Sequence, residues 1–119
     1  MIQKNTILKP VDSCGVLKVR VFHLYKGSNG RHAFSGDFLK VSVREIKPES
    51  ILKKKSKHRS IIVRTKYRNI RQDGSNIFFK NNGVVLLKKR LTPRGKTLKG
   101  PISRNIKRKK FLSSFSRSI

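Results

Sequence analysis

Apolar and polar residues alternate with a period of two over much of the first two thirds of the chain. In the run from residue 16 to residue 21, Leu17, Val19 and Val21 fall on one side, with Lys18 and Arg20 on the other. A period of two is typical of a β-strand that buries one face. This run is therefore predicted to be a strand with an apolar inner side and a cationic outer side.

Four further segments complete the predicted set of strands. Residues 39–44 repeat the alternation, with two cations and a serine on the outer side. Segments 60–66 and 83–87 are apolar on both faces, which indicates strands buried on both sides, and residues 76–80 predict a shorter strand.

Turn signals containing glycine separate these segments, at residues 26–30, 35–37, 73–75 and 81–83. About five short strands at such spacing predict a small mainly-β fold, an OB-like β-barrel that is closed or nearly closed.

Three segments depart from the strand pattern. Residues 47–59 contain Pro48 and a run of three lysines, and they are predicted to form a mobile basic loop. A second irregular basic stretch is expected between residues 92 and 101. Beyond it, Ser103 is a possible cap for a short C-terminal helix from about residue 104 to residue 114.

The length of 119 residues predicts one domain with one small core. Within it, residues 1–100 are expected to form the barrel with its basic loops, and residues 101–119 a C-terminal helical segment. Hydrophobic residues make up only 35% of the chain, but they are clustered, which argues against disorder throughout.

The charge of the chain changes the picture most. Thirty-one lysines and arginines stand against five acids, for a formal net charge of +26. Repulsion on this scale opposes compaction unless a polyanion neutralises it, which predicts a nucleic-acid partner. Three acids, Asp12, Asp37 and Asp73, stand close to glycines, and turns are expected there.

The same residues argue against an enzyme. The acids fall in separate turns, no Ser-His-Asp or Cys-His spacing is present, and residues 27–30 lack the Lys-Ser/Thr ending of a phosphate-binding loop. Cys14 is the single cysteine and the three histidines are scattered, so neither a disulfide nor a metal site is expected. No cofactor or small-molecule substrate is expected, and no run approaches the ~20 apolar residues of a membrane span.

Aromatic residues bear on the kind of nucleic acid. Of the adjacent pair Phe78 and Phe79, one is expected to point inward, and Phe22 and Phe38 fit core positions, as do Phe111 and Phe115. A module that stacks bases exposes aromatics among cations. The assignment to the core favours recognition of a folded RNA through its shape and phosphates.

Several motifs, spread in order along the chain, resemble one known family. They are Met-Ile-Gln at residues 1–3 with Thr6 and Leu8, Asp-Ser-Cys-Gly-Val at 12–16, Gly-Asp at 36–37 before the strand 39–45, the stretch from 61–66 through Arg71, 73–75 and 77–79 to Asn82 and 84–87, and Gly-Pro-Ile-Ser-Arg at 100–104. With these motifs the chain resembles the universal large-subunit ribosomal protein family L-fourteen over essentially its whole length.

The resemblance implies a five-stranded β-barrel with a β-hairpin extension and a short C-terminal helix. It also implies a structural constituent of the large ribosomal subunit that binds large-subunit rRNA. The implied neighbours are large-subunit proteins of the L-three and L-nineteen families, with small-subunit rRNA reached across an intersubunit bridge.

Candidate contact residues fall into three groups. The group expected to bind rRNA phosphates comprises Lys40, Arg44, Lys53, Lys54, Lys55, Lys57, Arg59, Arg64, Lys66, Arg68 and Arg71. The group that the resemblance assigns to the intersubunit bridge comprises Arg94, Lys96, Thr97 and Lys99, where Lys96-Thr97 replaces a Thr-Arg pair of the family and puts docking of a silencing factor in question. The C-terminal group, expected to contact rRNA or protein, comprises Arg104, Lys107, Arg108, Lys109 and Lys110.

The expected location is the mitochondrial matrix, in the large subunit of the mitochondrial ribosome. Asn105 departs from the family's usual Glu, the C-terminal run is basic, and the N-terminus resembles no cleaved presequence. A mitochondrion-encoded member fits these departures, and a plastid or the bacterial cytoplasm is the alternative.

Two other functions stay open at this point. A free nucleic-acid chaperone with an OB-like barrel predicts exposed aromatics and binding to arbitrary single strands. A basic peripheral membrane protein requires an amphipathic helix after Pro101, with Phe111, Leu112 and Phe115 on its apolar face.

Overall fold

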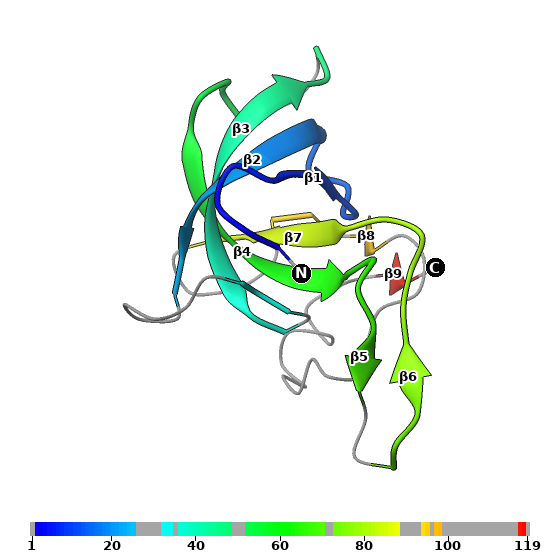
Figure 1. The fold of residues 1–119 in the computed structure, drawn as a ribbon. Coiled ribbons are helices and arrows are strands. Elements are labelled where there is room, and N and C mark those ends of the chain that lie inside the picture. Colours follow the sequence, from blue (N-terminus) through cyan, green and yellow to red (C-terminus); the bar gives the residue numbers. More distant parts are fainter. Residues whose placement is uncertain are drawn as a thin grey trace.

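Five strands close into a barrel in the computed structural model (Figure 1). The structure describes residues 2–25, 32–34, 36–48, 52–70, 73–88, 94–95, 97–98 and 117–118. The barrel strands, in their order around it, are β1 (Ile7–Pro10), β2 (Val16–Leu24), β3 (Phe38–Ile46), β4 (Lys57–Arg64) and β7 (Gly83–Leu87). The prediction of a mainly-β, five-stranded barrel is confirmed.

The barrel is closed by its one parallel pair, in which Lys9 of β1 lies opposite Gly83 of β7 and Pro10 lies opposite Val84. The other neighbouring barrel strands pair antiparallel. Gly83 has to be small, because a Cβ there would lie 2.8 Å from Cγ1 of Val11. Closure leaves no unpaired edge strand in the barrel.

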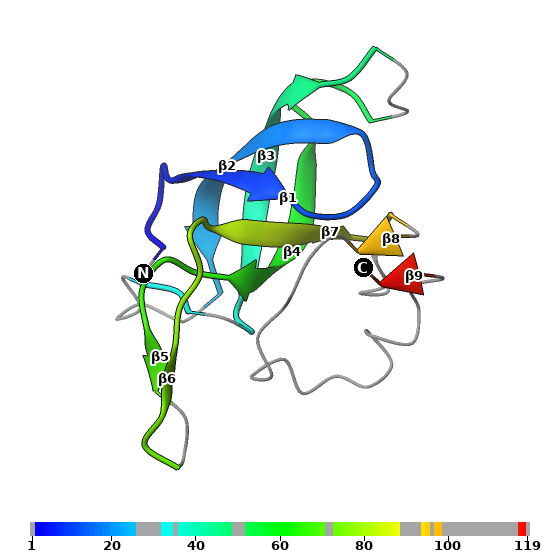
Figure 2. The same cartoon turned by 90° about the vertical axis from the view of Figure 1, so that its right-hand side faces the viewer.

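A two-stranded hairpin, β5 (Asn69–Ile70) with β6 (Asn76–Ile77), projects from the barrel in both views (Figures 1 and 2). It is the hairpin extension that the family resemblance implied. The strand pattern had placed residues 76–80 among the five strands of the barrel, and that was wrong: β1 is the fifth barrel strand. In the described residues β6 pairs over two residues, and Phe78 and Lys80 beyond it are exposed.

The apolar residues form two clusters. Inward-facing side chains fill the barrel, among them Leu8, Val19, Val21, Leu39, Val41, Val43, Ile62, Val84 and Leu86. A second cluster lies on the other side of β4 and β7 and contains Val11, Ile61, Val63, Val85 and Leu87. This confirms the prediction of burial on both faces for residues 60–63 and 83–87, whereas β4 ends at Arg64 and Lys66 is exposed, so the predicted strand extended two residues too far.

A β-bulge near the start of β2 overturns one predicted face. Leu17 is 43% exposed, whereas Val16 is only 6% exposed and belongs to the core. The register against β3 shifts on both sides of Lys18, so the alternation restarts at Val19. A bulge inserts one extra residue into a strand and reverses the side on which the preceding residues point. The prediction that Leu17 shares the face of Val19 and Val21 was therefore wrong.

Strand β4 begins within the segment predicted as a mobile loop. Lys57 lies opposite Ser42 and Arg59 lies opposite Lys40 in the antiparallel ladder with β3. Pairing with β3 satisfies backbone groups that a loop would leave to water, and this outweighs the basic composition of the segment. The irregular connection accordingly ends before Lys57, and the prediction that it extended to Arg59 was wrong.

At the C-terminus, the structure describes a short parallel pair outside the barrel, β8 (Thr97–Leu98) with β9 (Arg117–Ser118) (Figure 2). Strand β9 occupies two residues of the segment expected to be helical. The predicted helix between residues 104 and 114 lies outside the described residues.

The two leucines of opposite burial provide a test of the fold. Leu86→Ala, at a fully buried position, is expected to lower the free energy of unfolding by about 2–5 kcal/mol. Leu17→Ala is the matched control and is expected to change it by about 0.5 kcal/mol or less. Urea unfolding in high salt, which screens the charge repulsion, measures both. A larger loss for Leu17→Ala would contradict the bulged register.

Candidate nucleic-acid interface

Two of the turn acids bond the backbone of their own turns. The Asp37 Oδ2 atom accepts a hydrogen bond from the Phe34 amide at 2.7 Å, and Asp73 Oδ1 accepts one from the Ser75 amide at 3.0 Å. The neighbouring glycines take the left-handed conformation, with φ of 90° at Gly36 and 87° at Gly74. Only a residue without a Cβ adopts this conformation readily. Both carboxylates therefore stabilise turns, and these turns lie where the sequence predicted them.

The third turn acid, Asp12, is 7% exposed and ties together distant parts of the chain. Its Oδ2 atom accepts a hydrogen bond from the Gly95 amide at 3.3 Å. A Cβ on Gly95 would lie 2.7 Å from the Ser13 nitrogen, so the approach requires glycine. Burial raises the pKa of the Asp12 carboxyl, and the hydrogen bond from Cys14 opposes that shift.

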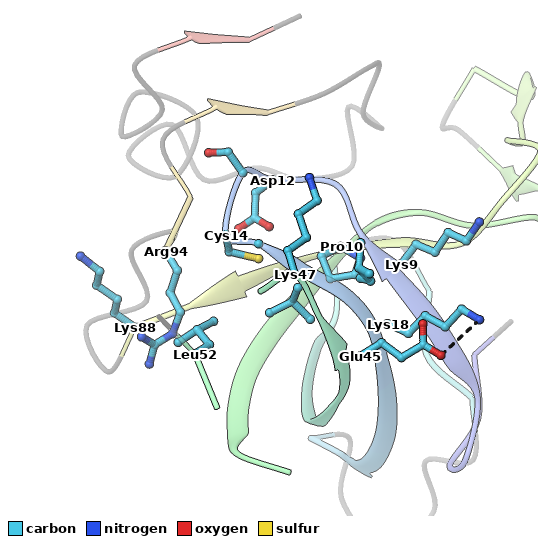
Figure 3. Close-up of a pocket in the computed structure, with 14 residues that line it drawn as sticks. Lys9, Pro10, Asp12, Cys14, Lys18, Glu45, Lys47, Leu52, Lys88 and Arg94 are labelled. Atoms are coloured by element: carbon cyan, nitrogen blue, oxygen red, sulfur yellow. Dashed lines mark ion pairs between the residues drawn. The ribbon is translucent and has the colours of Figure 1, made fainter. Parts of the chain in front are cut away.

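Asp12 and Cys14 lie side by side in a pocket of about 780 Å³ (Figure 3). Burial, followed by the nearby Asp12 carboxyl, raises the pKa of the Cys14 thiol to about 12, so the thiol stays protonated and is a poor nucleophile. Across the described residues, no group of three His, Cys, Asp or Glu side chains is placed to hold a metal ion. The cations that line the pocket are Lys9, Lys18, Lys47, Lys88 and Arg94.

The largest group of predicted rRNA contacts gathers on the outer sides of β3 and β4. Lys40 lies opposite Arg59, and Lys57 lies opposite Ser42 one step along the same ladder. Arg44 continues the row on β3 and is exposed. We call Lys40, Arg44, Lys57 and Arg59 the strand face. Residues 38–44 and 57–64 contain no acid, so the strand face is positive along both strands.

Lys53, Lys54 and Lys55 are exposed in the turn before β4 and extend the strand face. Lys55 has a φ of 63°, and its amide donates a hydrogen bond to the Val43 carbonyl at 2.9 Å. This contact holds the turn next to Arg44. The lysine run is thus an ordered turn at the end of the cationic row.

Arg64, Lys66 and Arg68 form a separate group, the hairpin base, where β4 leads into β5. The Lys66 amide donates a hydrogen bond to Asn82 Oδ1 at 2.9 Å, which fixes the backbone while the side chain stays exposed. Arg64 is half-buried, and desolvation by burial lowers the pKa of its guanidinium. The turn before β4 and the hairpin lie at opposite ends of the barrel (Figure 1). The predicted contacts therefore divide into two surfaces, and Arg71 lies outside the described residues.

The predicted bridge residues are placed only in part. Arg94 is half-buried, and its amide donates a hydrogen bond to the Leu86 carbonyl at 3.0 Å. Thr97 begins β8. The other predicted bridge and C-terminal contacts lie outside the described residues: Lys96, Lys99, Arg104, Lys107, Arg108, Lys109 and Lys110.

Aromatic side chains occupy the surface more than the sequence predicted. Phe22 is half-buried and belongs to neither cluster, so its assignment to the core was wrong. Phe38 is also half-buried but packs against the second cluster. Phe78 is 69% exposed, and Phe79 is the more buried of that pair, as alternation required. Phe111 and Phe115 lie outside the described residues. The alternation had concealed a second bulge in β2.

That second bulge lies between Val21 and His23, where Phe22 and His23 together oppose Lys40. Both side chains consequently lie toward the strand face, and Tyr25, 41% exposed, follows them. The sequence carries one signal of this arrangement: the buried Val21 and Leu24 are three residues apart instead of two. Sequence reasoning missed this group.

The fold and its surfaces define a class of protein, a small basic β-barrel with cationic faces suited to a polyanion. Within the described part of the chain, no helix is long and apolar enough to cross a membrane. The sequence profile of the family described as Ribosomal protein L14p/L23e matches residues 1–118, and the chain belongs to this family. It is a structural ribosomal protein and not an enzyme.

A relative, "Large ribosomal subunit protein uL14m" of Tetrahymena pyriformis, is 54% identical over 119 residues, which is the full length of both chains. Identity at this level along the entire chain confirms the resemblance drawn from the motifs. The similarity also confirms the expected location in the mitochondrial ribosome.

His58 is expected to make the stability of the folded protein depend on pH. Burial, and then the charge of Arg94, lowers its pKa below 6.5, so the unfolded chain binds the proton first. The contribution of neutral His58 to the free energy of unfolding is thus expected to be complete above pH 6.5. It should be lost progressively as the pH drops below that value. His58→Gln should flatten this dependence, measured by urea unfolding between about pH 5.5 and 8.

Arg94→Gln is the companion variant and should flatten the dependence only in part, because burial is the larger cause. Equal slopes in the original chain and in His58→Gln would contradict the assignment.

Proposed function

We propose that this protein is a structural constituent of the large ribosomal subunit that binds large-subunit rRNA through the strand face and the hairpin base. The observation that carries the proposal is the strand face itself: cations on two paired strands that contain no acid between residues 38 and 44 or between residues 57 and 64. Cations without interspersed acids attract phosphates and gain further from released counterions.

The geometry suits a folded RNA backbone. Lys40 and Arg44 are four residues apart on β3, a separation of about 13 Å at ~3.3 Å per residue. Lys57 and Arg59 lie on the neighbouring strand, ~4.8 Å away. A rigid, two-dimensional array of this size contacts several phosphates at once and favours a defined RNA shape over a flexible strand.

The partners follow from the family and from the relative's name. Large-subunit rRNA and neighbouring ribosomal proteins are the first, and proteins of the L-three and L-nineteen families are the proposed neighbours. Small-subunit rRNA is the proposed partner across an intersubunit bridge formed by Arg94, Lys96, Thr97 and Lys99. The C-terminal group of cations would add contacts to rRNA or protein.

A free nucleic-acid chaperone is the second candidate, and the exposed Phe78 and Tyr25 are the observations that favour it. Sedimentation of ribosomal subunits through sucrose after a salt wash separates the two. A ribosomal constituent stays with the large subunit and protects its rRNA. Release at moderate salt without rRNA protection would overturn the proposal and leave the chaperone.

The salt dependence of rRNA binding tests the strand face. Each phosphate contact contributes about 0.7–0.9 to the slope of log K against log salt. The triple variant Lys40→Gln, Lys57→Gln, Arg59→Gln should therefore lower the slope by about 2 to 3. Filter binding of the full chain to large-subunit rRNA at several salt concentrations measures it.

The matched control is Lys4→Gln, Lys9→Gln, Lys80→Gln, which removes the same charge at exposed lysines that do not pair with β3 or β4. A smaller loss of slope is expected for the control. Equal losses in both triple variants would show only general attraction and would contradict a specific strand face.

The bridge is tested by subunit joining. Lys96→Gln with Lys99→Gln is expected to weaken association of the large and small subunits while leaving the protein on the large subunit, because the bridge cations are proposed to face the other subunit. Light scattering on mixing purified subunits measures joining. Unchanged joining across a range of salt would remove these lysines from the bridge.

A further inference from the structure

The outer face of β2, β3 and β4 carries aromatic rings among the cations of the strand face. Phe22 and His23 project from β2, and Tyr25 directly follows that strand. Arg59 and Lys57 reach the Tyr25 and Phe22 rings from β4. The bulge in β2 creates this group because it turns two consecutive residues toward Lys40. None of these rings is needed to fill the barrel, whose interior is aliphatic.

Contacts between these side chains show how the group is built. The Arg59 guanidinium carbon lies 4.9 Å from the centre of the Tyr25 ring, and the Lys57 Nζ atom lies 5.4 Å from the centre of the Phe22 ring. His23 and Tyr25 meet edge to face, with centres 4.8 Å apart and planes at 86°. These contacts hold the rings in place before any ligand arrives.

We infer that this group, the aromatic patch of Phe22, His23 and Tyr25 with Arg59, stacks an unpaired base of the bound RNA. The inference rests on the proposed function and adds a recognition mode to it. An unpaired base stacks on an aromatic ring or on a guanidinium plane, and its phosphates need cations on either side. Tyr25 and Arg59 supply the two stacking surfaces, and Lys40 and Lys57 supply the flanking charges.

Charge decides for RNA over an apolar protein partner. Strands β2, β3 up to Arg44, and β4 contain no acid, so the patch lies in a field that concentrates polyanions. Cation–π contacts alone would stabilise the rings without any ligand. A base-stacking patch and a purely structural set of cation–π contacts can be distinguished, because only base stacking brings a base against the Tyr25 ring when RNA binds.

The chain itself provides the probe, because it has two tyrosines and no tryptophan. In the full chain carrying Tyr67→Phe, Tyr25 is the single fluorescent residue. An octamer of uridylate is expected to quench Tyr25, whereas an octamer of the same charge without bases is expected to bind and leave it unquenched. In the chain carrying Tyr25→Phe, the remaining Tyr67 should stay unquenched with both probes.

Affinity provides the second measurement. Tyr25→Leu should weaken binding of the uridylate octamer roughly five- to tenfold with an unchanged salt slope, since a stacking surface is lost and no cation is removed. Tyr25→Phe keeps the ring and should retain the affinity. Tyr67→Leu is the matched control, at 46% exposure, and should also retain it.

Quenching by both octamers, quenching of Tyr67 as strong as that of Tyr25, or full affinity of Tyr25→Leu would overturn the aromatic patch. Failure of the proposed function is a separate result, because it is scored by rRNA protection in the salt-washed large subunit. Protection of rRNA without quenching of Tyr25 would support the proposed function and reject only the aromatic patch.

Discussion

Electrostatic repulsion among thirty-one cationic side chains opposes the folding of this chain, and only five carboxylates are present to offset it. Asp12, Asp37 and Asp73 are committed to backbone amides. Glu45 lies 3.8 Å from Lys18 in an exposed ion pair, a contact worth about 1 kcal/mol or less. Compensation of the remaining charge therefore has to come from outside the molecule, which is the role proposed for rRNA.

The closed barrel is the form that tolerates this excess. Its interior takes the aliphatic residues of five short strands, and the outward positions that lie outside the second cluster can carry cations at no cost to the core. Closure through β1 and β7 also leaves no barrel edge on which a second copy could add a strand. The closed barrel thus keeps the stabilising apolar contacts in its buried clusters and leaves the cationic side chains on the surface.

Much of the fold was predictable from the sequence, because a period of two reports burial directly. The faces of residues 39–44 and the double burial of residues 60–63 and 83–87 are as predicted. The side of Leu17 and the start of β4 were not, since each depends on a partner strand that is distant in sequence. A bulge or a register depends on how two strands pair, so the pattern of one strand alone indicates it only weakly.

For the candidate site, the sequence by itself determined the charge, the family and the acids of the turns. Tertiary structure alone divided the predicted cations into the strand face and the hairpin base, and it alone brought Tyr25 against Arg59. The physical reason is that composition and motifs are local, whereas a surface is assembled from strands that the barrel makes neighbours. The sequence determines which residues are available to the surface, and strand pairing determines which of them lie on the same face.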